Sequence, residues 1–222
     1  DLSNSDRALD EALFNFVANA DLLYHCAGEL YHESLMHSLH VDGTKRLLNV
    51  AVQSKSRVGR WIQLSSVGAY GAYRDGVVDE TTPEHPLGRY ESTKTEADRL
   101  VREAAELHGL KCTIVRPSIV FGQSMNNRSL MQMVEIVRRG LFFFVGEGAQ
   151  VNYVHVDDLV AALMVCGERQ EATGETYILS ETTTLDQMVS ALAAGAKVKV
   201  PTLHLPEFPI RLMAKVFDSV ST

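Results

Sequence analysis

Short apolar runs alternate with longer amphipathic stretches through the first half of the chain. The apolar runs at 20–27, 60–66 and 110–116 have the length and composition of buried strands. The stretches at 33–53 and 90–108 carry apolar residues at the three- and four-residue spacing of helices. Gly and Pro residues punctuate the loop before the second helix. This order predicts an α/β fold with a doubly wound, Rossmann-like parallel sheet that has helices on both faces.

Beyond residue 122 the elements become shorter and the regular alternation is lost. Helical spacing recurs at 129–139, 157–166, 185–194 and 210–217. Short strand-like runs occur at 142–145, 152–156, 176–179 and 197–200. We therefore expect residues 1–122 to form one α/β domain. Residues 123–222 are expected to form a small substrate cap that also returns elements to the sheet, with the substrate cleft between sheet and cap.

The segment from Tyr90 to Lys94 carries the most informative chemistry. Positions four apart lie on one side of a helix, so the Lys94 ammonium is expected near the Tyr90 ring. There it would lower the Tyr90 pKa from its usual value of about 10. The preceding strand-like run ends in Ser65 and Ser66, whose hydroxyls could join the pair. A phenol, an amine and a hydroxyl together indicate redox chemistry at a carbinol carbon. The alternatives are a surface Tyr-Lys pair and a Ser66 that only satisfies backbone groups.

Composition and charge narrow the function. The 222 residues are 45% hydrophobic and carry a net charge of -7, with no block of Lys or Arg. Such a chain can bury a substantial core, but it lacks the basic surface that nucleic acids or anionic membranes require. No apolar stretch approaches the roughly 20 residues that span a bilayer, and no signal peptide is visible. Cys26, Cys112 and Cys166 are expected to be reduced core thiols. These features indicate a cytoplasmic protein that binds a small molecule, without nucleic acid or membrane as a partner.

Other polar residues are expected to have structural roles. His32, His37 and His40 are five and three positions apart, which does not place all three on one face of a helix. We therefore expect no metal site there. Asp157 and Asp158 precede an apolar helical run, where Asp commonly caps the exposed N–H groups of a helix.

Six segments carry a recognisable series of motifs. They are 25–28 (HCAG), 41–48 (VDGTKRLL), 64–71 (LSSVGAYG), 90–94 (YESTK), 115–122 (VRPSIVFG) and 154–159 (VHVDDL). In this order they resemble the extended short-chain dehydrogenase/reductase superfamily, especially its NAD-dependent epimerase/dehydratase branch. The resemblance implies NAD or NADP as cofactor. It also implies an oxidoreductase, epimerase or dehydratase that acts on a nucleotide sugar or a related hydroxy or keto compound.

The resemblance implies roles for individual residues as well. Ser66, Tyr90 and Lys94 would be catalytic: Tyr90 exchanges a proton with the substrate oxygen, Ser66 donates a hydrogen bond to it, and Lys94 binds the nicotinamide ribose. The residues expected to contact the cofactor are Asp1, Leu2, Cys26, Ala27, Gly28, His40, Leu64, Ser65, Tyr90, Lys94, Pro117, Ser118 and Ile119. Those expected to contact the substrate are Ser66, Val67, Tyr90 and Tyr153. A homodimer is expected through the helices at 33–53 and 90–108.

Several features depart from the family pattern. A Gly-rich turn for the cofactor pyrophosphate does not occur, and Asp1-Leu2 resembles the family's turn after the third strand. The resemblance therefore implies three strands and two helices upstream, so that residues 1–122 are a partial cofactor-binding domain that lacks its first strands. His40 stands where many relatives have an Asn that contacts a conserved water or the cofactor. Ile119 stands where sugar-nucleotide epimerases have Asn, which weakens the epimerase assignment. Arg116, before a proline, is expected to shape the backbone more than to act through its side chain. The alternatives are a reductase of sterol- or flavonoid-type ketones and a non-catalytic NAD(P)-sensing module.

Overall fold

The computed structural model describes residues 2, 7–18, 20–53, 58–72, 76–123 and 128–208. The expected cofactor contact of Asp1 and the helical pattern at 210–217 lie outside these ranges. The chain divides into two compact units, which are Asp1–Val120 with Val154–Ser180 and Phe121–Tyr153 with Glu181–Thr222. The chain leaves the first unit at Val120, close to the boundary expected after residue 122, and re-enters it at Val154.

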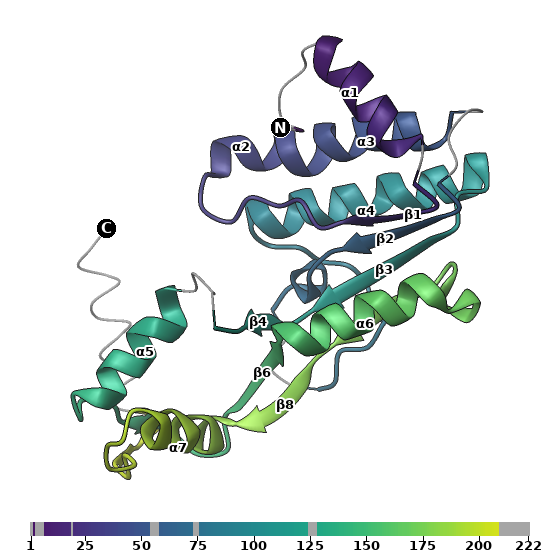
Figure 1. Cartoon of the computed structure of the whole chain (residues 1–222). Helices are drawn as coiled ribbons and strands as arrows, with labels where there is room; N and C mark the ends of the chain where they lie inside the picture. The colour runs from purple at the N-terminus through teal and green to yellow at the C-terminus, as the bar shows by residue number, and fades with distance from the viewer. Residues whose placement is uncertain are drawn as a thin grey trace. The chain divides into compact units, whose positions relative to one another are not determined.

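A four-stranded sheet forms the centre of the first unit. Its strands are β1 (Leu22–His25), β2 (Arg60–Leu64), β3 (Cys112–Pro117) and β7 (Thr176–Leu179), in the order β1-β2-β3-β7. All neighbouring strands are parallel, so the carboxyl ends of the strands lie at one edge (Figure 1). The α/β fold with a parallel sheet, expected from the alternating runs, is therefore confirmed.

Helices cover both faces of this sheet. The helices α3 (Gly43–Ala51) and α4 (Arg89–His108) pack together on one face, and α6 (Val156–Glu168) packs on the other (Figure 1). Side chains alternate along β2, so Trp61 joins the core under α3 and α4 while Ile62 joins the core under α6. The sheet is thus buried on both faces, which explains the continuous apolar runs of its strands.

The predicted helix at 33–53 is divided into three parts. The helix α2 (Glu33–His37) is followed by the π-helix η1 (Ser38–Asp42), which leads into α3. The wider turn places His40 and Val41 in the interior. A further helix, α1 (Arg7–Val17), was not predicted from the sequence, and it packs on α3 with Val17 fully buried.

Two helix ends differ from the sequence expectation. His155, and not Asp157 or Asp158, caps α6: its Nδ1 accepts a hydrogen bond from the Asp157 N–H at 3.3 Å. Both aspartates lie in the first turn, where their charge suits the positive end of the helix dipole. Arg60 donates from Nη1 to the carbonyl oxygens of Gly167 (2.6 Å) and Arg169 (2.8 Å) at the other end of α6.

The second unit is built from short elements. They are β4 (Ile119–Phe121), which begins in the first unit, α5 (Arg128–Arg138), β5 (Phe144–Val145), β6 (Gln150–His155), β8 (Glu181–Thr184), α7 (Leu185–Gly195) and β9 (His204–Leu205). The strands β6 and β8 pair in antiparallel fashion, and a capping box of Thr184 and Gln187 starts α7. Val137, Phe144 and Val189 are buried at its centre.

The strand expected at 197–200 does not form. Lys197 has a φ of 56°, in the left-handed region, and the Val198 N–H bonds to the Ala193 carbonyl at 3.0 Å. These residues therefore close the C-terminal end of α7, because a left-handed residue after a helix satisfies its last carbonyls. The strand β9 takes their place and pairs in parallel with β5.

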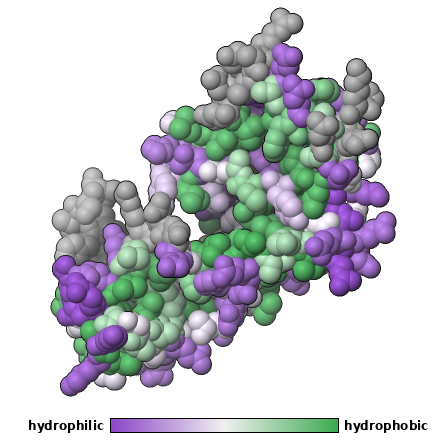
Figure 2. All heavy atoms as spheres, viewed as in Figure 1, coloured by the Kyte–Doolittle hydropathy of each residue, from purple (hydrophilic) through white to green (hydrophobic). Residues whose placement is uncertain are grey.

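Polar and apolar side chains are interspersed on the visible surface (Figure 2). Cys112 and Cys166 are buried as expected, whereas Cys26 is exposed because it follows the end of β1 and lies in a loop. Among the helices in the described part of the chain, none is both long and apolar enough to cross a membrane.

Candidate active site

Ser66 lies two residues after the end of β2, where the chain turns into the short 3-10 helix η2 (Val67–Tyr70). Its Oγ accepts a hydrogen bond from the Gly68 N–H at 3.1 Å, so it caps the turn and still has a proton to donate. A Cβ at Gly68 would lie 2.5 Å from the Glu91 Cγ. The turn that carries Ser66 and Val67 therefore packs closely against the first turn of α4, which carries Tyr90.

Lys94 connects α4 to the same end of β2. Its side chain is buried, and its Nζ donates a hydrogen bond to the Leu64 carbonyl at 2.6 Å. Tyr90, one turn earlier, is half-buried, and its ring meets the His40 ring edge-on with centroids 5.5 Å apart. The structure thus brings Ser66, Tyr90 and Lys94 to the carboxyl end of β2, where ligands bind in open parallel sheets.

The pKa of Tyr90 is raised, contrary to the sequence expectation. Burial of the phenol is the largest cause, and the carboxylates of Glu91 and Asp98 add to it. The Lys94 ammonium does not lower the pKa because it is turned toward the Leu64 carbonyl and lies near Asp98. Burial lowers the pKa of Lys94 itself, against the opposing effects of Asp98 and Cys26. Tyr90 therefore holds its proton in this arrangement and is suited to donate it.

Two histidines near Lys94 are uncharged. Burial and the Lys94 ammonium lower the pKa of His25 to about 3 and that of His40 to about 4. Both ring nitrogens of His40 already bond to protein atoms, Nε2 to the Glu29 N–H and Nδ1 to Thr93 Oγ1. The expected contact of His40 with the cofactor therefore cannot use these nitrogens as they stand. Within the described ranges, no cluster of three His, Cys, Asp or Glu side chains could hold a metal ion.

Most of the other predicted cofactor residues lie at the carboxyl ends of β1 and β3. Cys26 is exposed, Ala27 is half-buried, and a Cβ at Gly28 would lie 3.7 Å from the His40 Nε2. Pro117, the last residue of β3, is buried, and Ile119, the first residue of β4, is 48% exposed. The Leu2 carbonyl accepts a hydrogen bond from Arg46 of α3 at 3.1 Å.

Two serines test whether this edge fits a dinucleotide. Ser118 Oγ is buried and has no hydrogen-bond partner among the described residues, so a ligand hydroxyl or amide would satisfy it. Ser65 does not offer such a group, because its Oγ donates to Asp98 at 2.7 Å and its N–H to the Val115 carbonyl at 2.8 Å. The orphaned Ser118 hydroxyl and the Lys94 ammonium fit the nicotinamide and its ribose, and Ser65 has a structural role.

A buried ion-pair network behind the site was missed from the sequence. Arg116 donates to Asp98 Oδ2 from Nε at 3.2 Å and from Nη2 at 2.9 Å, and Nη2 also pairs with Glu84. The guanidinium lies 4.8 Å from the centroid of the Tyr70 ring. Besides the backbone role expected of Arg116, its side chain thus has a structural role as a buried partner of Asp98 and Glu84. Tyr90, Lys94 and Asp98 are spaced four apart, and this spacing was the available signal.

The second unit contains a separate apolar pocket. The cavity measures about 280 Å³ and is lined by Phe121, Leu130, Tyr153, Glu181, Thr183, Gln187, Met188, Ala191 and Leu192. The rings of Phe121 and Tyr153 meet edge-on with centroids 6.2 Å apart. The charged group among these residues is the Glu181 carboxylate, and none of them is basic. Tyr153 thus lines a pocket, and its contact with a substrate stays a prediction.

Comparison with known proteins identifies the family. The family model of the NAD dependent epimerase/dehydratase family matches residues 1–180. N-acetyl-alpha-D-glucosaminyl-diphospho-ditrans,octacis-undecaprenol 4-epimerase of Escherichia coli O157:H7 is 27% identical over 97% of the chain and 65% of its own length. The crystal structure of gox2253 is 28% identical, with a TM-score of 0.76 over 100% of this chain and 67% of its own.

A further solved structure supports the fold. UDP-glucuronic acid 4-epimerase from Bacillus cereus, in complex with NAD, has a TM-score of 0.72 at 19% identity, covering 93% of this chain and 68% of its own. The chain spans about two thirds of the length of these three proteins. The family match extends over the sheet, the Ser66 turn, α4 and α6. The chain therefore belongs to the NAD dependent epimerase/dehydratase family, whose members are NAD-dependent enzymes.

Proposed function

We propose that the protein is an NAD(P)-dependent oxidoreductase, epimerase or dehydratase that acts at a carbinol carbon of a nucleotide sugar or a related hydroxy or keto compound. One observation carries this proposal. Lys94 is hydrogen-bonded to the end of β2 beside Ser66, and it lies one helical turn from Tyr90. A proton donor, a hydrogen-bond donor and a buried ammonium then share one end of a strand, as carbonyl chemistry requires. The free thiols suit a reducing, cytoplasmic compartment.

The residues divide the reaction in a simple way. When bound, NAD(P) supplies the hydride acceptor or donor for the substrate carbon. In oxidation, Tyr90 takes the hydroxyl proton as the carbon loses its hydride, and a ketone forms. In reduction, Tyr90 returns the proton to the oxygen. Ser66 donates a hydrogen bond to that oxygen in both directions, and Lys94 with Ser118 would hold the nicotinamide ribose and amide.

A second candidate is a reductase of apolar ketones. The pocket of the second unit has Leu130, Met188 and Leu192 among its lining residues, and no lining residue is basic. A diphosphate carries negative charge and is usually bound by Arg or Lys. This lining therefore favours an uncharged, apolar substrate group.

Assays of the whole protein against two substrate panels test these proposals. With NAD(P) present, we expect turnover of nucleotide sugars or of apolar ketones. Turnover is measured by the absorbance of the reduced cofactor and by the stereochemistry of the product. Turnover of the first panel supports the leading proposal, and turnover of apolar ketones alone supports the second. Tight NAD(P) binding without turnover on either panel would contradict both and favour a non-catalytic sensing module.

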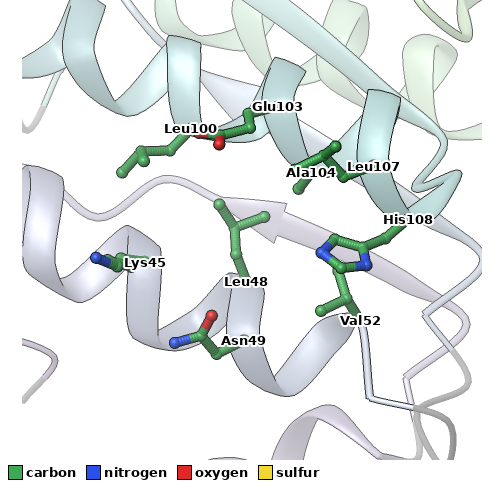
Figure 3. Close-up of a pocket in the computed structure, with 9 residues that line it drawn as sticks. All are labelled: Lys45, Leu48, Asn49, Val52, Leu100, Glu103, Ala104, Leu107 and His108. Atoms are coloured by element: carbon green, nitrogen blue, oxygen red, sulfur yellow. The ribbon is translucent and has the colours of Figure 1, made fainter.

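We also propose that the protein is a homodimer joined through α3 and α4. A groove of about 170 Å³ runs between these helices, with Leu48 and Leu100 among its apolar residues (Figure 3). Lys45 and Glu103 stand on opposite sides of it. In a two-fold interface each residue meets its counterpart's neighbours, so these charges could pair across the axis while Leu107, 68% exposed, becomes buried. A second copy of the chain therefore fits this surface.

Leu107→Asp is expected to convert this dimer into a monomer, because it places a charge in the apolar centre of the interface. Sedimentation velocity of the whole protein at micromolar concentration measures the change. Leu141→Asp, at a leucine that is 65% exposed in the second unit, is the matched control and should remain dimeric. A monomeric wild-type protein, or a Leu107→Asp variant that stays dimeric, would refute the proposed interface.

A further inference from the structure

His40 joins two segments of the candidate site through a fixed hydrogen-bond chain. The Glu29 N–H donates to its Nε2 at 2.8 Å. Since a backbone N–H can only donate, Nε2 carries no proton, and a neutral ring must carry its proton on Nδ1. That Nδ1–H donates to Thr93 Oγ1 at 2.8 Å. The Thr93 hydroxyl in turn donates to the carbonyls of Arg89 (2.9 Å) and Tyr90 (3.1 Å).

The surrounding structure holds this ring in place. His40 is 1% exposed and lies in the π-helix η1, whose wider turn directs it inward. Thr44 Oγ1 donates to the His40 carbonyl, and it lies 2.8 Å from the His25 Nε2. Both the backbone and the ring of His40 are therefore fixed by buried polar contacts, which are costly to leave unpaired.

The charges around His40 keep it neutral. Burial and, after it, the Lys94 ammonium lower its pKa to about 4, against the opposing effect of Glu29. The other titratable groups that face it are His25, which is uncharged, and Tyr90, whose ring it touches. At neutral pH the ring thus keeps one donor and one acceptor, and the chain from Glu29 to Tyr90 has one direction.

We propose that His40 is a positioning residue that couples the loop after β1 to the turn of α4 carrying Tyr90. The loop contains the predicted cofactor contacts Cys26, Ala27 and Gly28, and the turn contains the predicted proton donor. This inference rests on the proposed function of Tyr90. The edge-on contact with the His40 ring holds the Tyr90 side chain in place. The hydrogen bond from Thr93 to the Tyr90 carbonyl holds the Tyr90 backbone in place. A displaced cofactor loop would therefore also displace the phenol.

His40→Phe keeps a ring of similar size and removes both hydrogen bonds. We expect kcat to fall about 10- to 100-fold, since small misplacements of reacting groups cost that much, with a smaller change in the KM of the cofactor. In His40→Phe, the apparent pKa of the limb of the pH-rate profile that is assigned to Tyr90 should shift. This is the limb that Tyr90→Phe abolishes. Thr93→Val should act in the same direction, and Thr93→Ser should restore activity. Because both positions act through one chain, the double variant should be no worse than the poorer single variant.

Amide hydrogen exchange tests the coupling without cofactor or turnover. The Glu29 N–H donates to His40, so its exchange should become faster in His40→Phe and stay slow in Thr93→Ser. Unchanged kcat, pH profile and Glu29 exchange in a folded His40→Phe variant would overturn the inference. Losses that multiply in the double variant would do the same. If His40→Phe does not fold, the inference is tested by comparing the kcat and the pH-rate profile of Thr93→Val with those of Thr93→Ser. An active Tyr90→Phe variant would instead contradict the proposed function.

Discussion

Replacing Tyr90 with Phe is expected to lower kcat by about 100- to 10,000-fold, the usual loss when a positioned general acid or base is removed. Because the pKa of Tyr90 is raised, the phenol carries its proton at neutral pH. Reduction, which needs the protonated form, should be fast at neutral pH and fall as the pH rises through that pKa. Oxidation, which needs the phenolate, should rise over the same range. Both limbs should vanish in Tyr90→Phe.

The change is expected to be specific to catalysis. Tyr90→Phe keeps the ring that meets His40 edge-on, so the free energy of unfolding should change by less than about 0.5 kcal/mol. Tyr177→Phe, at a partly exposed tyrosine of β7 in the same sheet, is the matched control and should keep wild-type turnover. Turnover of Tyr90→Phe at the wild-type rate would rule out Tyr90 as the proton donor.

The sequence predicted the parts of the site that depend on local periodicity. Apolar runs and their spacing predicted the parallel sheet, and the four-residue step from Tyr90 to Lys94 predicted that both lie on one side of a helix. The prediction that the Lys94 ammonium lowers the pKa of Tyr90 was wrong. The ammonium bonds instead to the Leu64 carbonyl, 30 positions away in the chain. The spacing of residues along a helix shows which side chains can meet. It does not show which hydrogen-bond acceptor a side chain will bind.

Features that arise from long-range contacts could not be predicted in this way. The π-helix η1 interrupts a regular helical pattern without any Gly or Pro within it, and its consequence is the burial of His40. The Val198 side chain would suit a strand, but tertiary packing uses it beside Val189 at the end of α7. The pairing of Arg116 with Asp98 depends on the position of α4 over β3, which the sequence alone does not define.

That pair supports the largest predicted effect on stability. Arg116→Met is expected to lower the free energy of unfolding by about 3–5 kcal/mol at neutral pH, because it leaves the Asp98 carboxylate buried without the guanidinium that hydrogen-bonds to it. Asp98 is fully buried, and Ser65 would be its remaining hydrogen-bond donor among the described residues. Arg102→Met is the matched control, since Arg102 bonds to the same Glu84 at 2.9 Å but is 35% exposed. Its loss should be within about 1 kcal/mol.

The pH dependence of this loss identifies its cause. Burial already raises the pKa of Asp98, and removal of Arg116 would raise it further. The folded variant then binds a proton that the unfolded chain releases above about pH 4, so its stability is greatest at acid pH and falls as the pH rises through the folded pKa. The deficit of Arg116→Met, measured by urea unfolding, should therefore shrink toward acid pH. Adding Asp98→Leu should restore much of the stability at neutral pH. A loss of stability that does not change with pH and persists in the double variant would show that Arg116 acts through packing on Tyr70 and not through its charge.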